Sequence, residues 1–145
     1  MRVCAFRETT LPVPVIWEVL TDHEGMSTWL PGIGARLERP GRTVRNGVGA
    51  VRRIGLPGIG IREEITSYEP QCRLSYKALS GIPLRHYRAE VQLTGDGSRS
   101  AVTWSTMCEN RSWIVEFAMA LLTRLLLGAL LRTAARRAGQ VRTMP

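Results

Sequence analysis

The sequence predicts an α+β domain in which a curved antiparallel sheet of about seven strands closes around one long C-terminal helix. Two observations indicate this architecture. Residues 113–131 form an apolar run broken only by Glu116, Thr123 and Arg124, which is long enough for a core helix. Almost everything before that run reads as short strands separated by tight turns. A twisted sheet of this size curls, and its concave face needs a cover that only the long helix can provide.

The strands are expected where β-favouring residues lie between turn signals. Pro40-Gly41, Pro57-Gly58, Glu69-Pro70 and Asp96-Gly97 are such signals, because Pro presets a bend and Gly tolerates positive φ. Consecutive strands joined by short turns pair antiparallel. The predicted strands cover residues 2–9, 35–39, 44–55, 59–68, 73–79, 84–94 and 99–109.

Two short helices are expected after the first strand. Pro12 and Pro14 suit the first turn of a helix, and Asp22 can cap a second helix that ends near Trp29. The chain has 145 residues, which is enough for one domain with a substantial core. We therefore predict a single ligand-binding domain over residues 1–145, with residues 138–145 as a flexible tail.

Composition limits the function classes. The net charge is +8, yet the arginines are scattered and no nucleic-acid-binding motif accompanies them, so we expect no nucleic-acid partner. Cys4, Cys72 and Cys108 lack metal-ligand spacing, and no phosphate-binding loop appears, so no metal or cofactor is expected. The first residues lack the apolar region of a secretory signal, which favours a cytoplasmic location.

Register can be inferred from the turns. If Pro57-Gly58 is a two-residue loop, residues whose numbers sum to 115 face each other, so Arg52 lies opposite Glu63. An Asp96-Gly97 loop gives pairs that sum to 193, which places Ala89 opposite Trp104. Side chains alternate between the two faces, so these residues belong to one, mostly apolar face, which we assign as concave.

A buried Arg52–Glu63 pair has two interpretations. It could be a structural ion pair that sets the register of the sheet, because an unpaired buried charge is costly. Alternatively, it could orient the polar end of an apolar ligand, with Tyr76 and Tyr87 as hydrogen-bond partners. The full set of predicted ligand-binding residues is Arg52, Glu63, Ile54, Ile61, Ile65, Tyr76, Tyr87, Ala89, Trp104, Trp29, Phe117 and Leu121.

Catalytic residues are not evident. Glu63, assisted by Arg52, is the best acid–base candidate. His86 has the parity of Arg88 and Glu90, so we expect it on the convex face, away from the cavity. We expect His23 to be a cap or surface residue.

Several segments together resemble the SRPBCC superfamily of polyketide cyclases/dehydrases and lipid-transport proteins. They are VPVIWEVLTDHEGMSTWLPGI, NGVGAVRRI, REEITSYEPQCRLSYKALSGIPLRHYRAEVQL and SAVTWS. The resemblance implies the helix-grip fold of START domains and the birch pollen allergen, with an apolar or amphipathic ligand held between sheet and helix. Its G-x-G-x-x-R and E-x-I motifs fall on Arg52 and Glu63.

Three functions remain open at this stage. The first is binding or transport of a hydrophobic small molecule, either a lipid or a polyketide-like compound. The second is a cyclase, aromatase or dehydratase that uses the same cavity. The third is a membrane-surface or regulatory interaction module.

The long helix has alternatives of its own. Leu127 and Leu131 lie near the polar side of the helix, so we expect them to be exposed. With Arg132, Arg136 and Arg137 they could contact a membrane surface, or they could form a homodimer interface. In a further alternative, residues 113–131 span a bilayer.

Overall fold

The computed structural model describes residues 1–56 and 58–143 and confirms the predicted architecture. One antiparallel sheet contains all seven strands in the order β1-β7-β6-β5-β4-β3-β2, so the first strand pairs with the last. The strands are β1 (Arg2–Thr9), β2 (Gly34–Arg39), β3 (Val51–Leu56), β4 (Ile59–Glu69), β5 (Arg73–Ser80), β6 (Arg85–Gly95) and β7 (Ser100–Glu109). The helices are α1 (Val13–Thr21), the short 3₁₀ helix η1 (Glu24–Thr28) and α2 (Trp113–Thr143).

The two short helices begin as predicted. Pro12 occupies the N-cap of α1, where its missing N–H costs nothing. The Asp22 carboxylate accepts a hydrogen bond of 3.1 Å from the Gly25 N–H at the start of η1. These contacts turn the chain after β1 and bring η1 beside β2 and β3.

Residues 44–50 are not part of a strand, so the predicted strand over residues 44–55 is too long at its N-terminal end. The Gly47 N–H donates to Val44 O at 3.0 Å, and the Arg42 N–H donates to Val48 O at 3.0 Å. These local hydrogen bonds occupy backbone N–H and C=O groups that a longer strand would need for hydrogen bonds to the adjacent strands. Gly49 adopts a φ of +89°, which ends the turn and lets β3 begin at Val51.

The predicted register of β3 and β4 is confirmed, because Arg52 pairs with Glu63 and Ile54 with Ile61. The predicted register of β6 and β7 is wrong by two residues, because Ala89 lies opposite Thr106 and not opposite Trp104. The cause is a four-residue loop in place of a two-residue loop. Asp96 Oδ1 accepts hydrogen bonds from the Ser98 and Arg99 N–H groups and stabilises this longer turn. A shift of two keeps every side chain on its predicted face.

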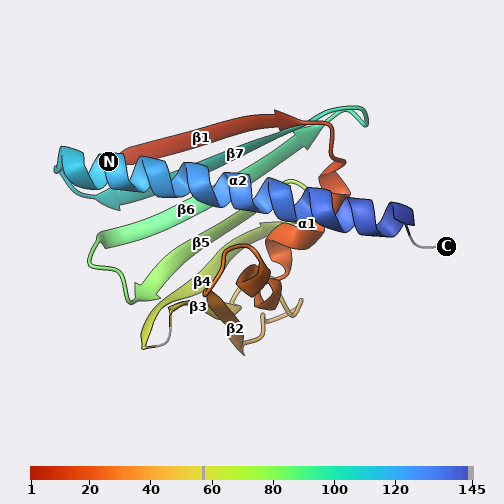
Figure 1. Cartoon of the computed structure of the whole chain (residues 1–145). Helices are drawn as coiled ribbons and strands as arrows, with labels where there is room; N and C mark the ends of the chain where they lie inside the picture. Colours follow the sequence, from red (N-terminus) through yellow and green to blue (C-terminus); the bar gives the residue numbers. More distant parts are fainter. Residues whose placement is uncertain (57, 144–145) are drawn as a thin grey trace.

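Helix α2 crosses the concave side of the sheet along β1 and β7, and its C-terminal half meets α1 (Figure 1). Met119, Thr123, Leu127, Leu130 and Ala134 form its buried stripe. The stretch Trp113–Gln140 is long and apolar enough to cross a membrane, but a core helix passes the same test. The packing of α2 on both β1 and α1 is at odds with the alternative in which residues 113–131 leave the domain as a membrane span.

Leu127 and Leu131 are buried, so their predicted exposure is wrong. This half of α2 lies between the sheet and α1, which bury residues 127–131, 133 and 134, while Arg132, Ala135 and Arg136 remain exposed. The helix also continues to Thr143, so the predicted tail is helical as far as that residue, and residues 144–145 lie outside the described part.

Two leucines of α2 provide a test of this packing. Leu130 is fully buried and Leu125 is half exposed, so Leu130→Ala should lower the free energy of unfolding by about 3 kcal/mol. Leu125→Ala should change it by less than about 1 kcal/mol, because it leaves no closed cavity. Urea unfolding of both variants measures the difference, and equal losses would contradict the orientation of the helix.

Candidate functional site

A cavity of about 190 Å³ lies between the sheet, the η1 segment and α2. Its wall is almost entirely apolar and aromatic, and the only ionisable groups on it are one ion pair and two tyrosines. The lining residues are Met26, Trp29, Leu30, Ile33, Arg52, Ile54, Gly55, Ile61, Glu63, Tyr76, Ile82, Tyr87, Trp104, Leu122 and Leu126.

Eight of the predicted ligand-binding residues line this cavity. They are Arg52, Glu63, Ile54, Ile61, Tyr76, Tyr87, Trp104 and Trp29. Ile65 and Ala89 are buried on the same face of the sheet but do not reach the cavity. Each lies two residues beyond a side chain that lines the cavity, Glu63 or Tyr87. The alternation of side chains along a strand predicts the face of the sheet but not the point along the strand where a cavity ends.

Phe117 and Leu121 do not line the cavity, which corrects the prediction. They are 68 % and 49 % exposed and point away from the sheet. Leu122 and Leu126 line the cavity in their place. The apolar run of α2 covers most of its circumference, so the sequence carried no signal for the rotation of the helix about its axis.

The other missed residues come from loops. Met26, Leu30 and Ile33 belong to η1 and the segment after it, and Ile82 belongs to the β5–β6 connection. A signal for them existed, because large apolar residues next to Pro31, Gly32 and Pro83 are unusual in loops that face only solvent.

The predicted Arg52–Glu63 pair is present and buried. Arg52 Nε and Nη2 both lie 2.8 Å from Glu63 Oε2. The two residues face each other across β3 and β4, so the register of this hairpin determines the pair. Excluding water from both charges is costly, and the short contacts offset that cost.

His23 completes this cluster, and the expectation that it is a cap or surface residue is wrong. Its side chain is fully buried, with Nδ1 3.2 Å from Arg52 Nη1 and Nε2 2.9 Å from Asn46 O. Because arginine can only donate, Nδ1 accepts from Arg52 and the Nε2–H donates to Asn46. Burial and the neighbouring Arg52 charge lower the pKa of His23 to about 4, so the imidazole is neutral.

Two tyrosines complete the polar end of the cavity. The Arg52 guanidinium carbon lies 4.5 Å from the centre of the Tyr76 ring, and Trp104 Nε1 donates to Tyr76 Oη at 3.2 Å. Burial raises the pKa of both Tyr76 and Tyr87. Both hydroxyl groups therefore remain protonated at neutral pH.

The polar atoms left for a ligand include an acceptor on Glu63 and neutral donors, among them the Trp29 indole N–H, which is buried and has no hydrogen-bond partner among the described residues. Arg52 uses Nε and Nη2 on Glu63 and Nη1 on His23. Within the described residues, Glu63 Oε1 has no hydrogen-bond partner. The charges of Arg52 and Glu63 balance, so this end of the cavity offers a carboxylate oxygen and hydroxyl groups without a net positive charge.

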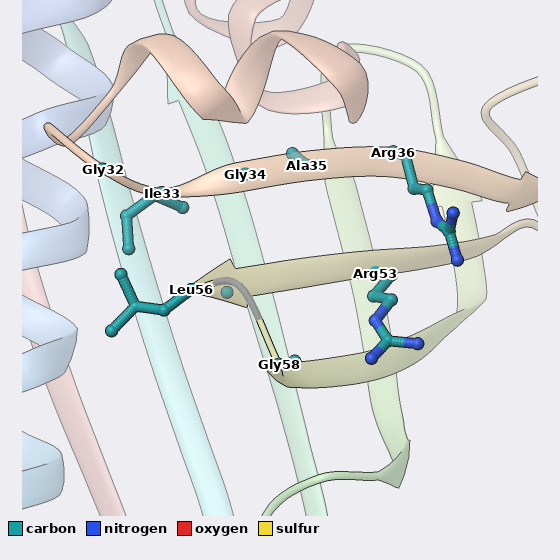
Figure 2. Close-up of a pocket in the computed structure, with 10 residues that line it drawn as sticks. Gly32, Ile33, Gly34, Ala35, Arg36, Arg53, Leu56 and Gly58 are labelled. Carbon is teal, nitrogen blue, oxygen red and sulfur yellow. The ribbon is translucent and has the colours of Figure 1, made fainter.

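Other positions carry less chemistry. His86 lies on the exposed convex side, as predicted, where its Nδ1 is 2.7 Å from Glu109 Oε1. Among the residues described, no group of three His, Cys, Asp or Glu side chains could hold a metal ion. A second hollow on the outer face of β2–β4 is shallow and lined largely by glycines, with Arg36 and Arg53 at one end (Figure 2).

Comparison with known proteins identifies the family. A sequence profile described as polyketide cyclase/dehydrase and lipid transport matches residues 2–140. The chain belongs to this family. A search of curated proteins returns no match.

Solved structures share the fold of this polyketide cyclase/dehydrase and lipid-transport family member at low sequence identity. A START superfamily protein from Mycobacterium smegmatis has a TM-score of 0.79 at 12 % identity, covering 93 % of this chain and 97 % of that one. The Zhui aromatase/cyclase from a Streptomyces species has a TM-score of 0.77 at 17 % identity, covering 95 % of each chain. The Aha1 dimer from Colwellia psychrerythraea has a TM-score of 0.68 at 14 % identity, covering 88 % and 92 %. These similarities establish the helix-grip fold.

Acid should destabilise this family member through His23. Its pKa is about 4 in the folded protein against 6.5 as the ordinary value, so the unfolded chain binds a proton more readily. The contribution of His23 to stability is complete above about pH 6.5 and is lost as the pH falls toward 4, by about 3 kcal/mol. Urea unfolding between about pH 7 and about pH 4 measures this loss.

Two glutamine variants isolate the contribution of His23. His23→Gln retains an acceptor and a donor but cannot titrate, so it should lose less stability between these pH values than the unmodified protein. His86→Gln should retain the full acid sensitivity, because His23 is still present. An unchanged pH dependence in His23→Gln would contradict the assignment.

Proposed function

We propose that this protein binds a neutral, mostly apolar small molecule in the cavity between the sheet and α2. The observation that carries the proposal is an apolar wall that ends in a charge-balanced Arg52–Glu63 pair. Apolar pockets with a few convergent polar groups are typical small-molecule sites. The family description also points to polyketide-like or lipid molecules, which are largely apolar.

The polar end favours a ligand that donates a hydrogen bond. Glu63 Oε1 is an unused acceptor, whereas the guanidinium of Arg52 is already engaged by Glu63 and His23. A ligand carboxylate would meet the charge of Glu63 and find no free cation to offset it. A hydroxyl or N–H group would instead form a charge-assisted hydrogen bond.

The size of the cavity sets an upper bound on the enclosed part of the ligand. About 190 Å³ is smaller than the roughly 300–1,000 Å³ of common ligand pockets. The cavity therefore suits one or two rings or a short chain. A longer molecule would extend out between Ile33 and Leu122, which come from opposite walls.

Three small aromatic probes test this proposal by isothermal titration calorimetry. We expect 1-naphthol to bind about tenfold more tightly than naphthalene, because its hydroxyl can donate to Glu63. We expect 1-naphthoate to bind more weakly than either, because its carboxylate lies beside that of Glu63. Equal or tighter binding of 1-naphthoate, or no binding of any probe, would refute the proposal.

A paired variant removes the polar end without leaving a single buried charge. In Arg52→Met/Glu63→Gln, the preference for 1-naphthol over naphthalene should fall to less than about threefold. The control is Arg53→Met, which changes the next residue of β3 on the opposite face of the sheet and should retain the preference.

An enzyme of the cyclase or dehydratase type is a second candidate, because Glu63 and two protonated tyrosines line the same cavity. Glu63 could take a proton from a carbon next to a carbonyl while a tyrosine hydroxyl donates to the carbonyl oxygen. Assays of turnover and affinity with poly-carbonyl substrates, on the unmodified protein and on Glu63→Gln, separate the enzyme from the binding protein. Lost turnover with retained affinity supports the enzyme, whereas lost affinity without any turnover supports binding alone.

A further inference from the structure

The N-terminal half of α2 presents a large apolar surface to solvent. Five apolar side chains between residues 113 and 125 that lie on one side of the helix are between 49 % and 75 % exposed. We call this surface the outer face of α2, and its members are Trp113, Ile114, Phe117, Leu121 and Leu125. The exposed side of a helix packed on a sheet is normally polar, so this surface is unusual for a protein free in water.

The charged side chains beside Leu121 and Leu125 of this face are positive. Arg124 and Arg132 are exposed on the same side of α2, and neither forms an ion pair with any residue described. Glu116 is the only acidic residue of α2. Glu116 is exposed, and at about 100° per residue it lies beside Trp113 at the N-terminal edge of the outer face, away from Leu121 and Leu125. The outer face therefore combines apolar and basic groups, with one acidic side chain at its N-terminal edge.

The outer face continues into the mouth of the cavity. Leu122 is partly exposed beside Leu121 and also lines the cavity. Leu56 and Ile59 are exposed at the ends of β3 and β4, and Leu56 lines the second hollow. In Figure 2 the side chains of Ile33 and Leu56 both point toward α2. Leu122 thus connects the outer face of α2 to the cavity wall.

We propose that the outer face of α2 docks the protein on an anionic lipid bilayer, with the helix lying in the plane of the surface. An apolar helix face flanked by arginines is the pattern of interfacial helices, and Trp113 is a residue type enriched at membrane interfaces. A second copy of the chain fits less well. Two such faces brought together would place two arginines of each copy, Arg124 and Arg132, in the contact with only one acidic side chain, Glu116, from each copy, which leaves an excess of buried positive charge.

This arrangement also explains why the basic cluster predicted for membrane contact must be redefined. Arg137 forms an ion pair with Asp22 at 3.0 Å, and Arg136 contacts Thr28 O and Thr133 Oγ1. These two arginines stabilise the packing of α2 against the short-helix segment. Among the arginines of α2 whose side chains the structure describes, Arg124 and Arg132 form no such contact with the short-helix segment and are available to lipid phosphates.

Vesicle co-sedimentation of the full chain tests the proposal. The vesicles contain phosphatidylcholine with about 30 % phosphatidylglycerol, and pure phosphatidylcholine vesicles serve as the comparison. We expect binding to the anionic vesicles to weaken at least tenfold in Phe117→Ser/Leu121→Ser. Arg124→Gln/Arg132→Gln should weaken it by about fivefold per arginine, and high salt should weaken it similarly.

Matched controls change the same residue types elsewhere. Phe6→Ser removes an exposed phenylalanine from β1, and Arg53→Gln/Arg88→Gln removes two charges from the outer face of the sheet. Both should retain vesicle binding. The four variants change only solvent-accessible side chains. Circular dichroism and thermal unfolding should therefore show that each variant is folded.

Two results would overturn the proposal. One is a failure of the outer face to account for vesicle binding: either the unmodified protein does not bind vesicles, or the helix variants and the control variants lose binding to the same extent. The other is a stable dimer in analytical ultracentrifugation that Phe117→Ser/Leu121→Ser dissociates, since the outer face would then be a protein interface. Binding is measured without a cavity ligand, so failure here leaves the proposed ligand binding untouched.

Discussion

The buried guanidinium of Arg52 is the constraint on which the polar end of the cavity depends. A charge this deep in an apolar interior must be matched on every donor, and the matching groups come from separate parts of the chain. Glu63 binds it from β4, the Tyr76 ring covers it from β5, and His23 approaches from the segment between α1 and η1. One side chain thus connects three strands to the short helices and sets the orientation of the residues that a ligand would meet.

The cavity exists because one helix covers the concave face incompletely. Helix α2 packs on β1 and β7, while the remaining wall comes from β3–β6 and is closed by η1 and the loop after it. The apolar side chains of η1 and of the loops line that space without filling it. The result is an enclosed volume at one end of the sheet, with Leu122 and Leu126 of α2 along one side.

The two halves of α2 have different environments, and this difference separates stability from interaction. Between the sheet and α1, the C-terminal half buries the side that carries Leu127, Leu130 and Ala134 and supplies much of the core. The N-terminal half has only the sheet as a neighbour, so one apolar side faces outward. An apolar surface that contributes nothing to folding is costly for solubility, which makes an external partner the simplest physical reason for it.

The sequence by itself determined the order of the elements, the register of β3 against β4 and the pairing of Arg52 with Glu63. These follow from local rules, because turn residues define hairpins and strand parity assigns faces. Only the tertiary structure decided that Leu122 faces the cavity while Leu121 faces outward, and that His23 reaches Arg52. A helix that is apolar on all sides has no periodicity from which to read its rotation, and a contact across 29 residues leaves no local signal.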